Sequence, residues 1–154
     1  MKKQVLIAPN ATIVGDVVLG KDVNIWYGAV LRGDNGRITV GDMTNIQDCC
    51  VIHDETTIGS FCTLGHGAIV HGCTVGDGCL IGMGAIVLGG AVLGEGCLVG
   101  AGALVTGKTN APAGSVLLGS PAKIVKTQSP EQIQAQKEHA IHYANQARAA
   151  FGGK

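Results

Sequence analysis

The chain has 154 residues and a formal net charge of zero, with 25 glycines and only 3% aromatic residues. This length allows a single domain, and the lack of any basic run in the sequence argues against nucleic acid as a partner. No stretch approaches the roughly 18 continuous apolar residues of a membrane span. The apolar run at residues 5–7 is too short for a signal peptide, so we expect a cytoplasmic protein that does not enter a membrane.

Aliphatic residues recur every six positions through most of the chain, with one step of nine residues and one of five. A hexapeptide period is typical of a parallel β-helix, in which three short strands make one triangular coil. The step of nine lies between Leu31 and Val40 and predicts a loop at residues 33–38. The repeating positions are Ile13, Leu19, Ile25, Leu31, Val40, Ile46, Ile52, Ile58, Leu64, Val70, Val75, Ile81, Val87, Leu93, Val99 and Val105.

The residue two places before each repeating aliphatic is usually small, as expected inside a narrow prism. Five of the six cysteines occupy this slot: Cys50, Cys62, Cys73, Cys79 and Cys97. Because the sequence has no CxxC pair and a reducing compartment is expected, these cysteines should pack as small apolar residues and form neither disulfides nor a metal site. Glycine often follows the aliphatic, as at Gly65 and Gly82, where we expect tight corners with positive φ.

After Val105 the repeat loosens, and residues 114–123 are expected to close the open end of the solenoid. Ser129, Pro130 and Gln132 form a capping box with proline at the first helical position, which predicts a helix to about Ala150. This helix is expected to pack along the prism or onto a neighbouring subunit through a weakly apolar stripe. The stripe is Ile133, Ala140, Ile141, Ala144 and Ala147. We therefore predict a β-helix domain at 1–126 and a C-terminal helix at 127–154.

Histidines that lie one coil apart in the predicted β-helix indicate the chemistry of the chain. The period stacks Arg32, His53 and His71 in one outward-facing column, with about 4.8 Å between neighbours. The same spacing places Asp48 under His66 on the preceding face. Two imidazoles in adjacent coils favour a metal site, with His66 beside them. His139 and His142 have no partner that the sequence identifies, so we expect ordinary helix residues there.

His66 is not expected to share a metal with His71 of its own chain. Five residues of extended backbone span about 16 Å, whereas imidazole nitrogens lie about 2.0–2.1 Å from a common zinc ion. A corner between the two histidines would turn them onto different faces. The sequence therefore predicts that His66 comes from a neighbouring subunit, in a homotrimer with one site at each interface.

Four segments resemble the γ-class carbonic anhydrase family: residues 25–34, 44–48, 51–53 and 65–72. The resemblance covers about residues 8–126, and its most specific motif is the pair His66 and His71 with His53 upstream. It implies an all-β fold, a left-handed parallel β-helix of hexapeptide repeats with a C-terminal α-helix. Such a fold is an exception to the right-handed crossover rule. The family also implies a trimeric assembly.

The resemblance also implies the roles of the site residues. His53 and His71 of one subunit and His66 of the next would bind Zn²⁺, or alternatively Fe²⁺ or Co²⁺. Gln47 matches the residue that orients the metal-bound water, and Tyr143 matches an active-site tyrosine on the C-terminal helix. Arg32 and Asp34 match an ion pair of the family at the subunit interface. Asp48 matches the acidic residue near that pair.

The implied activity is that of a carbonate dehydratase, a lyase that reversibly hydrates CO₂ to bicarbonate. Three neutral imidazoles leave zinc an open position for water, and a metal-bound hydroxide then attacks CO₂, as carbonic anhydrases are known to do. We expect Arg32 to be chiefly structural, because a guanidinium pairs well with carboxylates such as those of Asp34 and Asp48.

One departure from the family pattern predicts slow turnover. The best-known type carries an acidic loop between its first two histidines, whose glutamate shuttles protons. Here only residues 54–65 separate them, and Glu55 is the one glutamate in that segment. We therefore expect a low activity that depends on buffer.

Two other functions are open alternatives: a hexapeptide-repeat acyltransferase, with a histidine base and coenzyme A along the coils, and a non-catalytic metal-binding scaffold trimer. Three histidines in metal register exceed what acyl transfer needs, and no long acceptor-binding loop interrupts the repeat.

Overall fold

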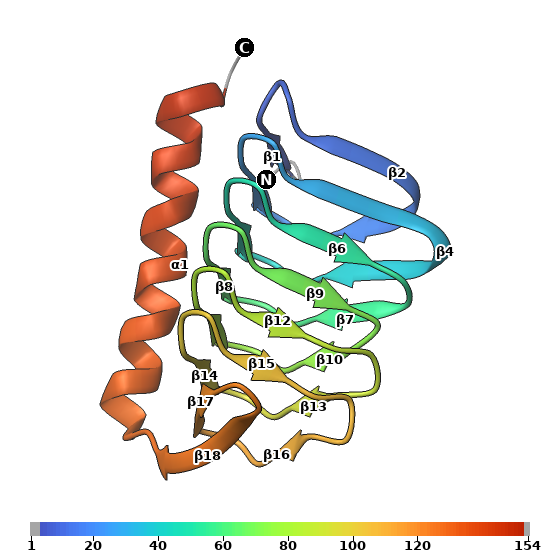
Figure 1. The fold of residues 1–154 in the computed structure, drawn as a ribbon. Helices are drawn as coiled ribbons and strands as arrows, with labels where there is room; N and C mark the ends of the chain where they lie inside the picture. The colour runs from blue at the N-terminus through green and yellow to red at the C-terminus, as the bar shows by residue number, and fades with distance from the viewer. Residues whose placement is uncertain (1–3, 153–154) are drawn as a thin grey trace.

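The computed structural model describes residues 4–152. Their backbone winds into a left-handed parallel β-helix of triangular cross-section, and one long helix, α1 (Pro130–Phe151), runs along its outside (Figure 1). The predicted solenoid with a C-terminal helix is thereby confirmed. The two units predicted at 1–126 and 127–154 include residues 1–3 and 153–154, which lie outside the described residues.

One sheet forms the face of the prism that α1 covers. Its strands pair in parallel from coil to coil, apart from an antiparallel hairpin at the end. In spatial order they are β1 (Leu6–Ile7), β3 (Asn24–Ile25), β5 (Asn45–Ile46), β8 (Thr63–Leu64), β11 (Leu80–Ile81), β14 (Leu98–Val99), β17 (Ser115–Gly119) and β18 (Ala122–Thr127). The hairpin of β17 and β18 ends this sheet, as predicted for residues 114–123, so β14 does not form an open edge.

The second sheet bends round a corner and forms the other two faces. One of these faces contains β6 (Val51–His53), β9 (Ile69–His71), β12 (Ile86–Val87) and β15 (Leu104–Val105). The other contains β7 (Thr56–Ile58), β10 (Thr74–Val75), β13 (Val92–Leu93) and β16 (Asn110–Ala111). The long strands β2 (Thr12–Leu19) and β4 (Val30–Val40) join the two faces at the N-terminal end.

The loop predicted at residues 33–38 is wrong, because these residues continue strand β4. They lie beside β2, with Gly33 opposite Gly15 and Ile38 opposite Val17. The register shifts between Gly15 and Val17, so the extra residues of the nine-residue step are absorbed by a bulge in a pair of long strands. The pair of β2 and β4 extends the coil beside Arg32, and Asp34 lies in this extension.

The repeating aliphatics form the core of the prism. On the helix-covered face, Ile25, Ile46, Leu64, Ile81 and Val99 are successive register partners, and all are fully buried. Burial of one such side chain contributes about 1.5–3 kcal/mol. The repeat therefore stabilises each coil through the coils above and below it, which keeps neighbouring strands in register.

The cysteines behave as the sequence predicts. The five in the small slot are buried, Cys49 is exposed, and all six are free thiols. Burial raises the pKa of Cys50 and of Cys73 to about 12, so these two thiols stay protonated at neutral pH.

The glycines that follow the core aliphatics do not have the positive φ that was predicted for them. Positive φ occurs two residues later, at Gly67 and Gly84. Gly65 and Gly82 are needed for another reason, because a Cβ there would lie 2.8 Å from the backbone nitrogen of Met83 and 2.6 Å from that of Ala101. The next coil approaches too closely to leave room for a side chain.

Helix α1 begins with the predicted capping box between Ser129 and Gln132 and packs along the prism of its own chain. Its buried stripe is Gln136, Ala140, Ala144 and Ala147. The prediction that Ile141 belongs to this stripe is wrong, because Ile141 lies about 100° round the helix from Ala140 and is exposed. Alanine allows a close approach, and the Gln136 side-chain amide donates to the carbonyl oxygen of Gly78 at 2.9 Å.

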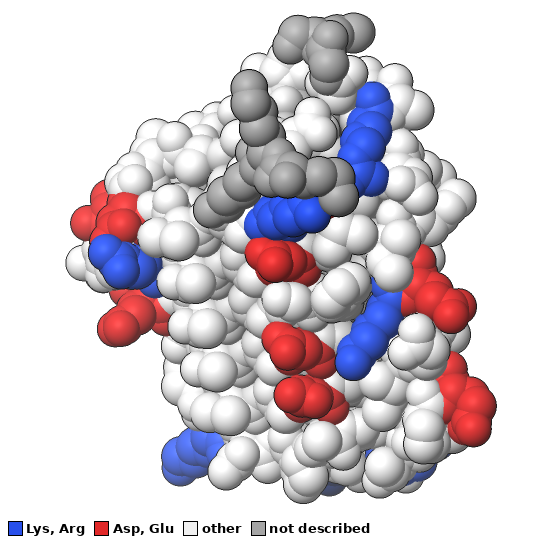
Figure 2. All heavy atoms as spheres, turned by 180° about the vertical axis from the view of Figure 1, so that it is seen from behind, with Lys and Arg blue, Asp and Glu red and all other residues white. Residues whose placement is uncertain are grey.

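Charged side chains of both signs are interspersed on the face shown in Figure 2. Several carboxylates at the corners of the prism link one coil to the next. Asp42 accepts the backbone N–H of Lys21 at 2.7 Å, and Asp77 accepts that of Ser60 at 2.8 Å. Within the described residues, no helix has the length and apolarity to cross a membrane.

Candidate functional site

The register of the β-helix places Arg32, His53 and His71 in one column, as predicted. Arg32 in β4 is the register partner of His53 in β6, and His53 is the partner of His71 in β9. The two imidazole rings have centroids 5.2 Å apart and an angle of 61° between their planes. Two imidazole rings therefore lie side by side on one edge of the prism.

Carboxylates border this histidine pair. The Nε2 atom of His53 lies 3.3 Å from Oδ1 of Asp34, and Nε2 of His71 lies 4.0 Å from Oδ2 of Asp54. Nevertheless, Nε2 of His53 is buried and has no hydrogen-bond partner within the described part of the chain. A buried ring nitrogen without a partner is unfavourable, and a metal ion that accepts its lone pair would satisfy it. The pair thus fits the donor set of a divalent transition metal.

The Arg32–Asp34 ion pair beside these histidines has an N–O distance of 3.0 Å. Partial burial acts to raise the pKa of Asp34, but Arg32, the backbone of Asp34 and His53 together outweigh it and hold this pKa below its ordinary value. Asp34 is therefore a carboxylate at neutral pH. Asp48, which was also expected to be available to Arg32, pairs with His66 instead.

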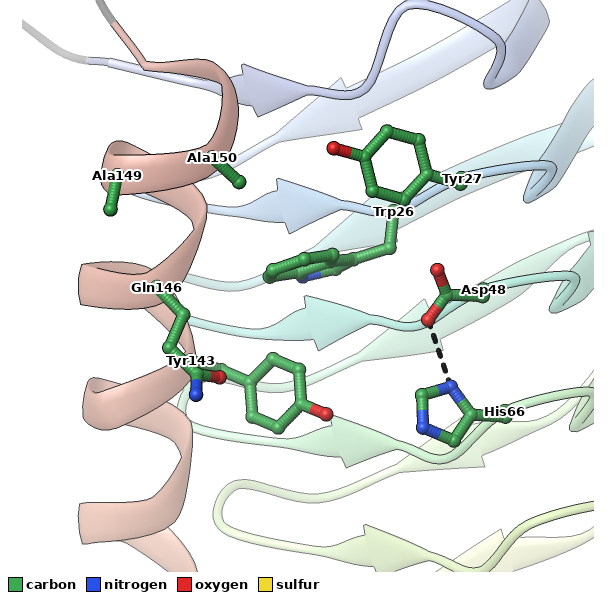
Figure 3. A pocket seen from close by; sticks show the side chains of 8 residues that line it. All are labelled: Trp26, Tyr27, Asp48, His66, Tyr143, Gln146, Ala149 and Ala150. Atoms are coloured by element: carbon green, nitrogen blue, oxygen red, sulfur yellow. Dashed lines mark ion pairs between the residues drawn. The ribbon is translucent and has the colours of Figure 1, made fainter.

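His66 lies at the corner between β8 and β9, before the first residue of β9, whereas His71 is the last residue of that strand. Its Nδ1 atom lies 2.8 Å from Oδ2 of Asp48 in the preceding coil, so the two residues are stacked one coil apart, as predicted (Figure 3). A carboxylate on one ring nitrogen orients the imidazole and leaves the other nitrogen free for a metal. Half of the His66 side chain is exposed, which leaves it accessible to a second molecule.

An aromatic cluster places Tyr143 of α1 close to His66. The Trp26 ring packs edge-on against Tyr143, with centroids 5.4 Å apart, and against Phe151, at 5.1 Å. Trp26 and Tyr143, with Asp48 and His66, line a cleft of about 560 Å³ in which the Tyr143 hydroxyl points toward His66 (Figure 3). Burial and the charge of Asp48 raise the pKa of Tyr143, so its phenol stays protonated and can donate a hydrogen bond.

Gln47 lies on the other side of His66, in a groove of about 460 Å³ between α1 and the sheet. It is buried, and its side-chain amide nitrogen donates to Oδ1 of Asn45 at 3.1 Å. The Asn45 amide in turn donates to the Thr63 hydroxyl at 2.8 Å. This chain of bonds holds Gln47 in place and leaves its Oε1 atom as an acceptor.

His139, for which the sequence identified no partner, has Tyr143 as a neighbour in the structure. It lines the same groove as Gln47, His66 and Tyr143, and its ring packs against that of Tyr143 with centroids 5.2 Å apart. The spacing of four residues between His139 and Tyr143 could have indicated one shared helix face. It could not indicate that this face borders His66, because the docking of α1 decides that.

The three predicted metal ligands do not meet within one chain. His53 and His71 share one corner of the prism, and His66 occupies the corner at the other end of the same face. Across residues 4–152, no three histidine, cysteine or acidic side chains converge closely enough to hold a metal ion. A complete three-histidine site therefore requires a second copy of the chain.

Fold and site together define a hexapeptide-repeat β-helix protein with histidines stacked between coils. The family model described as "Bacterial transferase hexapeptide (six repeats)" matches residues 1–33 and 72–107. A probable carbonic anhydrase of Methanocaldococcus jannaschii is 46% identical over 147 residues, which are 93% of this chain and 92% of that protein. The chain thus belongs to the γ-class carbonic anhydrase family.

Two further proteins show the range of this similarity. The mitochondrial gamma carbonic anhydrase 2 of Arabidopsis thaliana is 43% identical over 95% of this chain, but the chain spans only 56% of that relative's length. The crystal structure of a hexapeptide transferase family protein from Anaplasma phagocytophilum is 43% identical and has a TM-score of 0.92, with 96% of this chain and 90% of that chain covered.

Proposed function

We propose that this protein is a metal-dependent hydratase of the γ-class carbonic anhydrase type, which interconverts CO₂ and bicarbonate. The observation that carries the proposal is the His53–His71 pair, stacked by the strand register, in which the buried Nε2 of His53 has no hydrogen-bond partner among the described residues. The relative of the same family from Methanocaldococcus jannaschii, named a probable carbonic anhydrase, supports the choice of reaction.

The proposed metal is Zn²⁺, or alternatively Fe²⁺ or Co²⁺, held by His53 and His71 of one subunit and His66 of the next. Support for a trimer comes from the face formed by β6, β9, β12 and β15, which has the His66 corner on one side and the His53–His71 corner on the other. This face exposes aliphatic side chains, including Val51 and Ile69 at 37% and 36%. When three such faces pack about a threefold axis, these side chains become buried. Each interface then joins the His66 corner of one subunit to the His53–His71 corner of the next.

When bound there, a divalent metal lowers the pKa of water toward neutrality, which supplies hydroxide for attack on CO₂. Gln47 would accept a hydrogen bond from that water through Oε1, because its amide nitrogen is already bonded to Asn45. A neutral amide orients the water without competing for the metal. Asp48 holds the His66 ring through Nδ1, and Tyr143 offers its hydroxyl on the same side.

The Arg32–Asp34 pair would have a structural role at this interface. Both side chains are about half exposed in the single chain, so their ion pair gains strength when a second subunit excludes water from it. A charge-assisted hydrogen bond between a guanidinium and a carboxylate is suited to such a boundary. This role leaves the reaction itself to the metal site, with Gln47 and Tyr143 close to His66.

The test is stopped-flow CO₂ hydration by protein loaded separately with Zn²⁺, Fe²⁺ and Co²⁺, with elemental analysis of the same samples. We expect close to one metal ion per chain and a hydration rate that rises with pH through one ionisation near neutrality. His53→Ala should remove both the metal and the activity, whereas His142→Ala, on the exposed side of α1, should retain both. Loaded wild-type protein without hydration activity would favour the scaffold alternative, and coenzyme A binding by that protein would favour the acyltransferase.

A further inference from the structure

Helix α1 contributes a histidine that no step of the proposed reaction uses. His139 lines the groove of about 460 Å³ that also contains Gln47, His66 and Tyr143. The walls of this groove are largely apolar and include Leu80 and Leu98. Among its lining residues in the described part of the chain, the titratable ones are His66, His139 and Tyr143.

Tyr143 lies between His139 and the corner that carries His66. The rings of His139 and Tyr143 pack edge to face, with centroids 5.2 Å apart, one helical turn from each other. The Tyr143 hydroxyl points toward His66 and Asp48 (Figure 3). A phenol hydroxyl both donates and accepts, so it can relay a proton between two neighbours. His139 itself is exposed, so bases in the solvent can reach it.

CO₂ hydration releases one proton in each turnover: CO₂ + H₂O gives HCO₃⁻ + H⁺. That proton has to leave the site before the next turnover, and histidine is the side chain that exchanges protons most readily near neutral pH. Glu55, the one glutamate between His53 and His66, lies against Gly36 of β4 and does not line the groove. Among the described residues, no glutamate lines the groove beside His66.

We propose that His139 is the proton-transfer residue of this site. Its neutral imidazole accepts the proton that hydration releases, by way of Tyr143 or solvent in the groove, and becomes imidazolium. It then gives the proton to a base in the bulk solvent and returns to the neutral form. This inference rests on the proposed hydratase function. It replaces two expectations from the sequence: that His139 is an ordinary helix residue, and that buffer alone must carry the proton.

The variant His139→Ala tests this role. Because the proton leaves in a step that does not involve CO₂, kcat at low buffer concentration should fall at least about tenfold, while kcat/KM stays unchanged. A high concentration of imidazole buffer should restore kcat toward the wild-type value. Metal content should equal that of wild type. The matched control is His142→Ala, which removes a histidine from the same helix outside the groove and should leave kcat unchanged.

A second measurement does not depend on turnover. In metal-free wild-type protein, the NMR signals of the Tyr143 ring should shift with pH, and part of this shift should depend on His139, since the two rings are in contact. In the His139→Ala variant this part of the shift should disappear, whereas the His142→Ala variant should keep the full wild-type shift. If wild type hydrates CO₂ and His139→Ala has the same kcat at low buffer, His139 is not the proton-transfer residue. If wild type shows no hydration in any metal form, the hydratase proposal itself fails.

Discussion

Mixing two inactive variants is expected to rebuild a defined fraction of the proposed metal sites. His53→Ala destroys one member of the stacked pair, whose rings are 5.2 Å apart, and His66→Ala removes the ligand at the opposite corner. An intact site then forms only where a His66→Ala chain, which keeps His53 and His71, meets a His53→Ala chain, which keeps His66. Neither variant alone should bind metal tightly, because each has lost a ligand from every site.

The fraction recovered follows from the closure of a three-membered ring. Every mixed trimer has one junction of the productive kind among its three interfaces, whichever variant is in excess. Random assembly of equal amounts leaves about a quarter of the trimers unmixed, so about one quarter of all sites should be rebuilt. An isolated mixed trimer should hold about one third of the wild-type metal and activity.

The assay is joint refolding of the two variants, each with a different affinity tag, followed by isolation of doubly tagged trimers. Their metal content and CO₂ hydration are then measured. The matched control mixes His53→Ala with His71→Ala. Both substitutions alter the same column, so no junction is intact and no site should form. Equal recovery from the two mixtures, or none from the first when doubly tagged trimers are present, would refute a site shared between subunits.

Three further predictions concern residues around the site and the packing of α1 on the prism. Asp48→Asn, which weakens the 2.8 Å contact to His66, should lower metal affinity about 10–100-fold in a chelator competition; unchanged affinity would mean that Asp48 does not orient the ligand. Gln47→Ala should reduce kcat while the metal content measured by elemental analysis stays at the wild-type level, and a loss of metal would instead make Gln47 part of the binding shell. Ala144→Leu, at a fully buried position of α1, should lower the free energy of unfolding in urea by about 1–3 kcal/mol, whereas the same change at exposed Ala149 should have little effect.

The repeat made most of the fold predictable. In a β-helix each residue contacts its counterpart one coil away, so a spacing along the chain converts directly into a contact in space. The stacking of His53 on His71 and of Asp48 over His66 followed from this rule alone. The capping box at Ser129 was equally local, because it involves only a few consecutive residues.

Predictions failed where the strict period was interrupted or where a single feature had two explanations. Residues 33–38 could be a loop or a longer strand pair, and only the partner strand β2 decides between these. Gly65 and Gly82 were attributed to positive φ, whereas the close approach of the next coil is what excludes a side chain there. The roles of the site residues and the trimer stay predictions.

The sequence by itself thus determined the solenoid, its core and the column of histidines, because these depend on a periodic backbone whose contacts are repeated at a constant spacing. Only the tertiary structure decided how α1 lies on the prism, and with it the burial of Gln136, the exposure of Ile141 and the place of His139 and Tyr143 beside His66. The docking of a helix on a sheet has no period to follow. It depends on the fit of particular side chains, and here the alanines of α1 let it approach closely enough for His139 to share a groove with Gln47.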